Sequence, residues 1–359
     1  MDAVLLVGGQ GTRLRPLTIS APKPMLPTAG VPFTAHQLAR ARDAGVDHVV
    51  LATSYQPEVF EQYFGDGSAF GLDLEYVTEV EPLGTGGGIR NVAGRLRGGP
   101  DDPVLIFNGD VLSGVDLRAL VDHHTDAGAQ VTLHLVEVED PRAFGVVPTD
   151  ESGRVTAFLE KTPDPPTNRI NAGCYVFRRS VIDAIPAGRP VSVERETFPG
   201  LLAAGELVVG HVDSGYWLDL GTPAAFVQGS CDLVRGRVAS SALPGPVGES
   251  LLLVDAAVAG DAIVDGGSTI GRGASVGAGS TVASSVVFDG AVIEAGAQVR
   301  ESVIGRGAVI GAGTVVTSAV IGDGARIGAG NELLSGVRVF PGAALADGAV
   351  RFSSDRASS

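Results

Sequence analysis

Aliphatic residues recur at every sixth position, with an occasional step of five, through the last third of the chain. Most steps follow the pattern aliphatic-Gly-x-Gly-small-x, as in residues 270–274 and 310–314. A period of six fits neither an α-helix nor an isolated amphipathic strand, but it is typical of a hexapeptide β-helix with three short strands per coil. The aliphatic side chains would fill the narrow interior, and the glycines would allow tight corners. The residues in register are Leu252, Val258, Val264, Ile270, Val276, Val282, Val287, Ile293, Val299, Ile304, Ile310, Val316, Ile321, Ile327, Leu333 and Val339.

The first two thirds of the chain alternate strand-like and helix-like segments. The predicted strands are residues 4–7, 49–53, 74–78, 104–107 and 131–138. The predicted helices are residues 32–45, 57–64, 86–96, 116–127 and 223–237. Strands joined by helices of this length form parallel βαβ units, which bind ligands at the carboxyl ends of the strands. More closely spaced strands over residues 144–177 indicate an inserted β-rich lobe. We therefore predict two domains, residues 1–240 and residues 241–359.

Charge and composition exclude several classes of protein. With a net charge of −15, the chain lacks the basic face that a sequence-independent nucleic-acid binder needs. No apolar run approaches the length of a membrane-spanning helix, and the acidic N-terminus has no signal-peptide pattern. Cys174 and Cys231 are too few for a disulfide framework or a four-cysteine zinc site. We therefore expect a cytoplasmic protein without nucleic-acid or membrane partners.

A glycine-rich turn follows the first predicted strand, in residues 6–17 (LVGGQGTRLRPL). Its backbone N–H groups can approach a polyphosphate closely, and Arg13 adds a forked donor suited to phosphate oxygens. The turn is not a P-loop, because no Gly-Lys-Ser/Thr follows, and Leu14 occupies the third glycine position of a dinucleotide fingerprint. Prolines on both sides of Lys23 fix its backbone, so that the ammonium group is aimed rather than mobile.

Lysine is rare in this chain, which makes its two positions informative. Of 26 basic residues, only Lys23 and Lys161 are lysines, which indicates a need for a compact ammonium group unless they persist by chance. Glu160 precedes Lys161, and Asn171 follows shortly after. A carboxylate and an amide can bracket sugar hydroxyls while the lysine contacts a phosphate. The ordinary alternative is an exposed strand end with a Glu–Lys pair.

Two aspartates are candidate metal ligands. Asp110 ends the sequence Asn108-Gly109-Asp110, just beyond an apolar strand, and Asp219 lies in the motif Trp-Leu-Asp-Leu-Gly-Thr at residues 217–222. Mg²⁺ prefers one or two carboxylates together with phosphate oxygens and water. Each aspartate alone could equally be a helix cap, but as a pair they form a plausible metal clamp.

Taken in order, these motifs resemble the signature of the sugar-1-phosphate nucleotidyltransferases, and the resemblance covers almost the whole chain. The matching segments are residues 8–18, 22–24, 79–87, 108–110, 160–161, 171–173 and 217–222. The resemblance implies a Rossmann-like nucleotidyltransferase core followed by a C-terminal left-handed β-helix. It also implies an enzyme that joins a sugar 1-phosphate to a nucleoside triphosphate, releases pyrophosphate and uses Mg²⁺. The sequence is most similar to the bacterial members that make GDP-mannose from GTP and mannose 1-phosphate.

The family's functional residues carry over to positions that match its motifs. The implied nucleotide-binding residues are Leu6, Gly8, Gly9, Gly11, Thr12, Arg13, Lys23, Glu79, Gly84, Asn108 and Asp110. The implied sugar-phosphate-binding residues are Gly145, Glu160, Lys161 and Asn171. The implied catalytic residues are Arg13, Lys23, Asp110 and Lys161, and the implied metal ligands are Asp110 and Asp219. Such a site would catalyse in-line transfer by positioning and charge neutralisation.

The side chain just before the Pro-Leu-Gly segment indicates the base. Relatives that use thymidine or uridine nucleotides often have glutamine there, whereas this chain has Glu79. An ionised carboxylate accepts both N1–H and N2–H₂ of guanine, so Glu79 favours GTP. Glu81, two residues later, could take this role instead.

Three alternatives stay open on the sequence. Another nucleotidyltransferase would use glucose 1-phosphate with UTP, dTTP or GTP, because nothing in Glu160 or Asn171 distinguishes the two sugars. An acetyltransferase β-helix would need a general base, usually histidine, but all six histidines precede the repeats. A non-catalytic regulatory subunit could have lost the lysines or the aspartates, which are present. The flat apolar sides of a β-helix usually dock, so we also expect a homo-oligomer, possibly formed through this domain.

Overall fold

The computed structural model describes residues 1–352 and divides them into two compact units. The first unit contains residues 1–9 and 37–217, and the second contains residues 10–36 and the chain from residue 218 onward. Residues 10–36, which include part of the glycine-rich turn, are thus grouped with the repeats. The predicted boundary at residue 240 rests on composition and stays a prediction.

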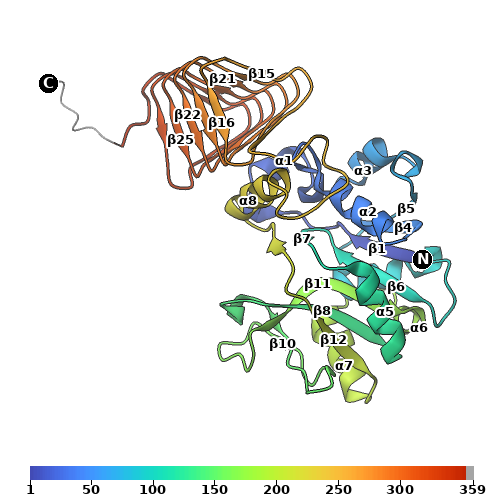
Figure 1. The fold of residues 1–359 in the computed structure, drawn as a ribbon. Helices are drawn as coiled ribbons and strands as arrows, with labels where there is room; N and C mark the ends of the chain where they lie inside the picture. Colours follow the sequence, from blue (N-terminus) through green and yellow to red (C-terminus); the bar gives the residue numbers. More distant parts are fainter. Residues whose placement is uncertain (353–359) are drawn as a thin grey trace. The chain divides into compact units, whose positions relative to one another are not determined.

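A mixed sheet organises the first unit (Figure 1). Its strands are β1 (Asp2–Leu6), β4 (His48–Thr53), β5 (Asp73–Thr78), β6 (Pro103–Asn108), β8 (Val131–Glu137), β9 (Gly145–Val146), β10 (Leu159–Glu160), β11 (Arg169–Arg178) and β12 (Val208–Val212). The strands β5, β4, β1 and β6 are adjacent and parallel, as the alternating pattern predicts. The long strand β11 lies antiparallel between β6 and β8. The predicted β-rich lobe is therefore only partly separate, because its last strand is an interior strand of the main sheet.

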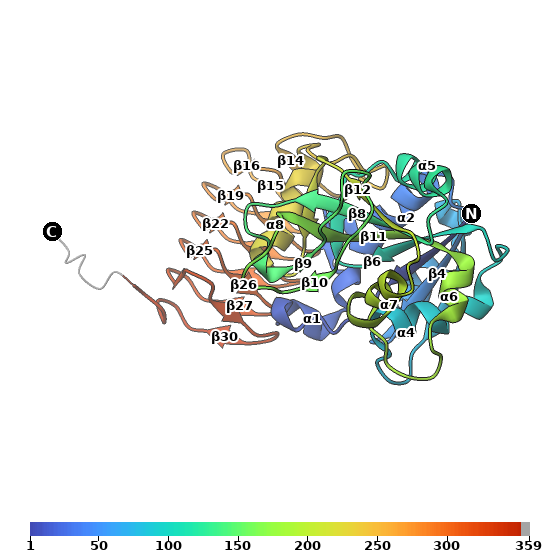
Figure 2. The ribbon, with the colours of Figure 1, turned by 90° about the horizontal axis from the view of Figure 1, so that it is seen from below.

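Helices cover both faces of this sheet, with α2 and α5 on one side and α4, α6 and α7 on the other (Figure 2). The helices of this region are α2 (Phe33–Asp43), α3 (Pro57–Phe64), α4 (Gly84–Asn91), α5 (Leu117–Ala127), α6 (Arg179–Ala184) and α7 (Phe198–Ala203). The shorter helices are η3 (Ser68–Phe70), η4 (Ala93–Arg95), η5 (Pro141–Ala143) and η6 (Val193–Thr197). Ile89 of α4, Ile182 of α6 and Phe198 of α7 pack against strand residues such as Ile106 and Tyr175 in one core. This core holds the strand ends, and therefore the site, in place.

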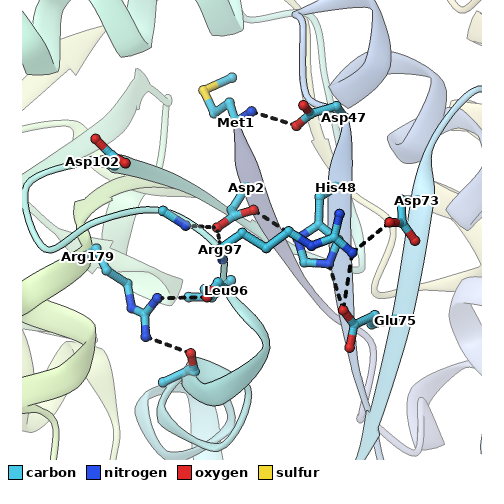
Figure 3. Close-up of polar contacts among 12 residues, drawn as sticks. Met1, Asp2, Asp47, His48, Asp73, Glu75, Leu96, Arg97, Asp102 and Arg179 are labelled. Atoms are coloured by element: carbon cyan, nitrogen blue, oxygen red, sulfur yellow. Dashed lines mark hydrogen bonds and ion pairs between the residues drawn. The ribbon is translucent and has the colours of Figure 1, made fainter.

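A polar network closes the amino edge of the parallel strands (Figure 3). The buried carboxylate of Asp2 accepts hydrogen bonds from His48 Nδ1 at 2.9 Å, from the Arg97 backbone N–H at 2.6 Å and from the Gly98 N–H at 2.9 Å. His48 Nε2 lies 3.3 Å from Glu75 Oε1 on the next strand. The network joins the starts of β1, β4 and β5, so the opposite, carboxyl edge is the one left for ligands.

The second unit contains the predicted β-helix, whose described residues form three parallel sheets (Figure 1). The first sheet contains β14 (Ser250–Leu252), β17 (Ser268–Ile270), β20 (Val286–Val287), β23 (Val303–Ile304), β26 (Val320–Ile321) and β29 (Arg338–Val339). The second contains β15 (Ala257–Val258), β18 (Ser275–Val276), β21 (Val292–Ile293), β24 (Val309–Ile310), β27 (Arg326–Ile327) and β30 (Ala344–Leu345). The third contains β16 (Ile263–Asp265), β19 (Thr281–Ala283), β22 (Gln298–Arg300), β25 (Val315–Thr317) and β28 (Glu332–Leu333).

The hexapeptide register is confirmed strand by strand. Ile270 pairs with Val287, and Val287 pairs with Ile304, so one coil takes 17 residues here. The aliphatic series from Ile270 to Val339 is buried in one interior cluster. The first coil is less covered, because only the following coil packs on it: Val258 and Val264 are partly buried, and Leu252 is 49% exposed.

Further segments of the second unit pack on the repeats. Those with residues in the shared apolar cluster include η1 (Thr12–Leu14), α1 (Leu17–Ser20) and α8 (Pro223–Val234). The same part of the chain contains η2 (Lys23–Met25), β2 (Pro27–Thr28) and β3 (Val31–Pro32). Leu14, Leu17 and Leu26 form an apolar cluster with Phe226 of α8 and with β-helix residues such as Val303. The segment that follows the glycine-rich turn is therefore seated on the β-helix and on α8.

Candidate active site

In the first unit, the carboxyl ends of β1 and β6 meet without room for side chains. The Gly109 N–H donates to Leu6 O at 2.8 Å, and a Cβ at Gly109 would lie 2.9 Å from Val7 Cγ1. A Cβ at Gly8 would lie 2.8 Å from Ser54 Oγ. Glycine is thus required sterically at Gly109, where a Cβ would also meet the Leu6 backbone, whereas at Gly8 only the Ser54 hydroxyl would have to move. The small residues leave the backbone of the turn open to a phosphate chain. Gly9 has open space on its Cα, as close approach of a ligand would need.

A bulge of β11 lies beside Asn108 at the same edge. A Cβ on Gly173, whose φ is +74°, would come within 2.8 Å of Asn108 Nδ2. Asn171 holds the bulge, because its Oδ1 accepts from the Gly173 N–H at 3.0 Å and its Nδ2 donates to the Tyr175 hydroxyl at 2.8 Å. Asn171 therefore has one amide hydrogen and one lone pair left for a sugar. The half-buried Asp110 follows Asn108 and Gly109 directly.

The predicted sugar residues lie opposite each other on a short ladder. Glu160 on β10 pairs with Gly145 on β9, and a Cβ on Gly145 would meet Glu160 Oε2 at 3.0 Å. Lys161 follows with a positive φ of 52°, and its Nζ lies 3.8 Å from Glu160 Oε1. The lysine side chain is 65% exposed, and its backbone N–H donates to Phe144 O at 3.1 Å. The structure thus brings Gly145, Glu160 and Lys161 together.

Glu79 differs from Glu81 in its surroundings. Glu79 Oε2 accepts a hydrogen bond from the Leu83 N–H at 3.2 Å, and a Cβ on Gly88 would meet Glu79 Oε1 at 2.7 Å. Burial raises the pKa of Glu79, although the Leu83 N–H opposes the shift. Glu81 is exposed. The half-buried carboxylate beside the start of α4, where Gly84 lies, is therefore the better placed of the two to meet a base.

In the second unit, the turn from Gly11 is tightly held. Gly11 has a φ of +59°, and a Cβ there would lie 2.8 Å from Lys23 Cβ. Its carbonyl accepts from Thr18 Oγ1 at 2.9 Å and from the Leu14 N–H at 3.0 Å. The turn through Thr12 and Arg13 therefore has one conformation, which suits a group that must meet a phosphate chain in fixed geometry.

Two cations of this unit share one carboxylate. Lys23 Nζ lies 3.9 Å from Asp219 Oδ1, and Arg13 Nη2 lies 4.0 Å from Asp219 Oδ2. The Lys23 side chain is only 10% exposed, whereas that of Arg13 is 65% exposed. The cluster thus presents a fixed ammonium and an accessible guanidinium, which is suited to binding phosphate oxygens.

Trp217, a residue of the first unit, supports the predicted sugar site, although the sequence patterns predicted no role for it. Its Nε1–H donates to Ala172 O at 3.0 Å, and its ring contacts Phe144 edge-on at a centroid distance of 5.6 Å. It therefore supports both the Asn171–Gly173 bulge and the strand that carries Gly145. Its being the single tryptophan of the chain is the signal that could have found it.

Through residue 352, no group of three or more His, Cys, Asp or Glu side chains is arranged to hold a metal ion. The same residues include no helix with the length and hydrophobicity needed to cross a membrane. Both Cys174 and Cys231 are buried free thiols. Mg²⁺ does not require such a group, because it is usually bound by one or two carboxylates together with water and substrate phosphate oxygens.

The glycine turns at the carboxyl edge of the parallel strands leave main-chain groups accessible, an arrangement suited to binding a polyphosphate. Residues 2–236 match the family described as nucleotidyl transferase, so the chain belongs to that family, and residues 247–350 match the family described as GMPPB C-terminal domain. The predicted family and the predicted succession of an α/β core and a β-helix are confirmed. Nucleotidyltransferases of this kind generally use a divalent metal.

The chain is also similar to individual proteins. It is 62% identical to the "Mannose-1-phosphate guanylyltransferase" of Mycobacterium tuberculosis, over 99% of this chain and 98% of that protein. It is 38% identical to "Mannose-1-phosphate guanylyltransferase 1" of Arabidopsis thaliana, over 71% of this chain and 72% of that one. Among solved structures, HddC from Yersinia pseudotuberculosis complexed with GMP-PN aligns with a TM-score of 0.55 and 27% identity, over 64% of this chain and 97% of that chain.

Proposed function

We propose that the protein joins GTP and α-D-mannose 1-phosphate to give GDP-mannose and pyrophosphate. The observation that carries this function is the 62% identity to the mycobacterial mannose-1-phosphate guanylyltransferase, which extends over nearly the full length of both chains. Identity at that level and coverage includes the core and the repeats alike. The presence of both lysines and both aspartates agrees with an active enzyme rather than a regulatory subunit.

The reaction asks the protein mainly to position two anions. A phosphate oxygen of mannose 1-phosphate attacks the α-phosphorus of GTP in line, and pyrophosphate leaves. Lys23 and Arg13 neutralise charge on the triphosphate and on the departing pyrophosphate, while the backbone from Gly8 to Thr12 donates hydrogen bonds to it. The nucleotide is also contacted by Leu6, Gly84 and Asn108. The Glu79 carboxylate accepts hydrogen bonds from N1–H and N2–H₂ of guanine.

The sugar phosphate is held by a separate group of residues. Lys161 contacts its phosphate as a point charge, and its exposed side chain can move toward the ligand. Hexose hydroxyls are bound by Glu160, by the Gly145 backbone and by the hydrogen-bonding groups of Asn171 that the bulge does not use. The attacking oxygen is thereby fixed relative to the α-phosphorus, which lowers the barrier to transfer together with charge neutralisation.

We assign the metal to Asp110 and Asp219, with Mg²⁺ as the ion. One or two carboxylates plus substrate oxygens are the ligands that Mg²⁺ prefers, and the two aspartates fit that donor set. When bound, the ion supplies charge neutralisation at the phosphate oxygens.

We further propose a cytoplasmic homo-oligomer formed through the β-helix. The buried free thiols suit a reducing compartment, and the first coil exposes the apolar side chains of Leu252, Val254 and Ile263. Light scattering of the purified protein gives the number of subunits, and a monomer at all concentrations would contradict this part of the proposal.

The function is tested by assay of the purified chain with GTP, mannose 1-phosphate and Mg²⁺. GDP-mannose and pyrophosphate should form in equal amounts, and Asp110→Asn, which keeps the shape of the side chain, should remove metal-dependent turnover. Parallel assays with glucose 1-phosphate, UTP, dTTP and acetyl-CoA identify the alternatives. Preference for another pair of substrates, or no turnover at all by the folded protein, would overturn the proposal.

A further inference from the structure

One arginine of the β-helix reaches the loop that carries Arg13. Arg338 lies on β29, and its Nη1 donates to the carbonyl oxygens of both Arg13, at 2.9 Å, and Arg15, at 2.7 Å. Both partners belong to the second unit, although 325 and 323 residues of sequence separate them from the arginine. A single guanidinium nitrogen thus bridges two main-chain carbonyls on either side of Leu14.

The same loop is anchored at its other points. The Gly11 carbonyl is held by Thr18 Oγ1 and by the Leu14 N–H. Leu14 and Leu17 are buried in the apolar cluster with β-helix residues that include Phe288. These contacts hold the start and the apolar side of the loop, while Arg338 holds its two carbonyls. The loop is therefore restrained on three sides by groups of its own unit.

The Arg13 side chain extends from this restrained loop toward Asp219. The Arg13 carbonyl points to Arg338, while Arg13 Nη2 lies 4.0 Å from Asp219 Oδ2. A Cβ on Gly221 would collide with the Arg13 guanidinium, so glycine leaves the space that this side chain occupies. Two carbonyl dipoles would also repel a polyphosphate, and a guanidinium bonded to both oxygens offsets that repulsion.

We propose that Arg338 is a positioning residue for transfer, which orients the Arg13 loop toward the pyrophosphate half of GTP. The inference rests on the proposed function, since it assumes that Arg13 contacts this group. It assigns to the β-helix a part in the chemistry of the core, through one side chain that touches no substrate. Because the Arg338 side chain is exposed to solvent on the surface of its coil, replacing it leaves no cavity in the repeat interior.

The test compares Arg338→Met, Arg338→Lys and a control, Arg326→Met. Arg326 is an exposed arginine on β27 of the same repeats, so the control removes an equal charge from the β-helix. In Arg338→Met, KM for GTP and KM for pyrophosphate in the reverse reaction should each rise about 10-fold, because the loop no longer presents Arg13 in fixed geometry. KM for mannose 1-phosphate and the melting temperature should stay near wild type. Arg338→Lys keeps a donor of several hydrogen bonds and should recover part of the loss.

Hydrogen exchange supplies a readout that does not depend on activity. Backbone amides of residues 11–15 and 17 should exchange faster in Arg338→Met than in wild type, and those of the repeats should not change. A wild-type protein that makes no GDP-mannose would refute the proposed function, whereas the exchange experiment would still test the loop contact. An active wild type with unchanged KM for pyrophosphate in Arg338→Met would overturn the inference. So would a uniform rise of all KM values with a lower melting temperature, which would indicate a merely structural role.

Discussion

The two lysines of this chain occupy opposite environments. Lys23 is nearly buried, with Nζ 3.9 Å from Asp219, and its backbone is fixed between two prolines. The side chain of Lys161 is 65% exposed. Lys161 itself has a positive φ and directly follows a two-residue strand. A fixed ammonium suits a triphosphate whose geometry must be set before transfer, and an exposed one suits a second substrate that must enter and leave.

Replacement of Lys161 by alanine should weaken use of the sugar phosphate far more than use of GTP. Loss of one charged phosphate contact should cost roughly 2–4 kcal/mol in the transition state. The measurement is KM and kcat for mannose 1-phosphate and for GTP in Lys161→Ala, with Lys161→Arg as a charge-conserving control. Values for mannose 1-phosphate that remain at the wild-type level would remove Lys161 from the site.

Replacement of Glu79 by glutamine should reduce the preference for guanine. The amide would oppose one guanine N–H with its own N–H₂, and an unmatched buried donor costs about 1–3 kcal/mol, so kcat/KM for GTP should fall roughly 10- to 100-fold. The loss with UTP should be smaller. Glu81→Gln is the matched control, and it should change little because Glu81 is exposed. The measurement is the ratio of kcat/KM for GTP to kcat/KM for UTP in each variant. If this ratio falls in Glu81→Gln and not in Glu79→Gln, Glu81 is the residue that binds guanine.

Among the secondary-structure elements, the parallel strands have two ends that differ in function. Their amino ends are joined by the polar network of Asp2, His48 and Glu75 (Figure 3). Their carboxyl ends carry the turns at Gly8 and Gly109. Burial opposes ionisation of Asp2, but hydrogen bonds from Gly98, His48 and Arg97 outweigh it and lower the pKa of Asp2. The ionised carboxylate therefore stabilises the folded state.

Asp2→Asn should destabilise the protein at neutral pH and matter less in acid. An amide has only one oxygen, so its N–H₂ would face either the Arg97 and Gly98 N–H donors or Nδ1 of His48, and the negative charge that both sides stabilise is lost, at a cost of about 1–3 kcal/mol. Since the folded pKa lies below its ordinary value of 3.8, the carboxylate's contribution is present above that value and is lost as the pH falls through the folded pKa. Urea unfolding at pH 7 and at lower pH measures the difference in the free energy of unfolding between wild type and Asp2→Asn. Asp47→Asn, which removes the charge of an exposed ion pair, is the control. A difference in the free energy of unfolding between wild type and Asp2→Asn that grows in acid would contradict the role of the ionised carboxylate.

At the scale of the whole molecule, the repeats are a folding partner of residues 10–36 and not an appendage. Leu14, Leu17 and Phe226 are at most 3% exposed, and the cluster that buries them includes β-helix residues. Fully exposing an apolar side chain of this size costs roughly 1.5–3 kcal/mol. The β-helix thus contributes to the stability of the segment that carries Arg13 and Lys23.

A fragment of residues 1–240 should therefore associate or unfold at temperatures where the full chain is stable. Size-exclusion chromatography and thermal unfolding by circular dichroism compare the two. The same fragment with Phe226→Gln and Val227→Gln should be more soluble, because these side chains of α8 lose their cover with the repeats. A soluble fragment that melts at the temperature of the full chain would show that the cluster is dispensable.

Several features could be predicted from the sequence because their causes are local. The period of six determines which face of each short strand is buried, so the interior from Ile270 to Val339 follows from it. The glycines after residues 4–7 predicted the turn that begins at Gly8. The structure adds that Gly109, just beyond the predicted strand of residues 104–107, has no room for a Cβ. The alternation of apolar runs and helices similarly predicted the parallel strands.

Other features depend on which segments meet, and only the tertiary structure decided them. The position of β11 between β6 and β8 follows from burial on both faces of the sheet. Asn171 uses much of its hydrogen-bonding capacity on Gly173 and Tyr175, which no motif shows. The contact of Arg338 with the Arg13 loop joins residues 325 apart, and local preferences contain no information about a pairing formed at that distance.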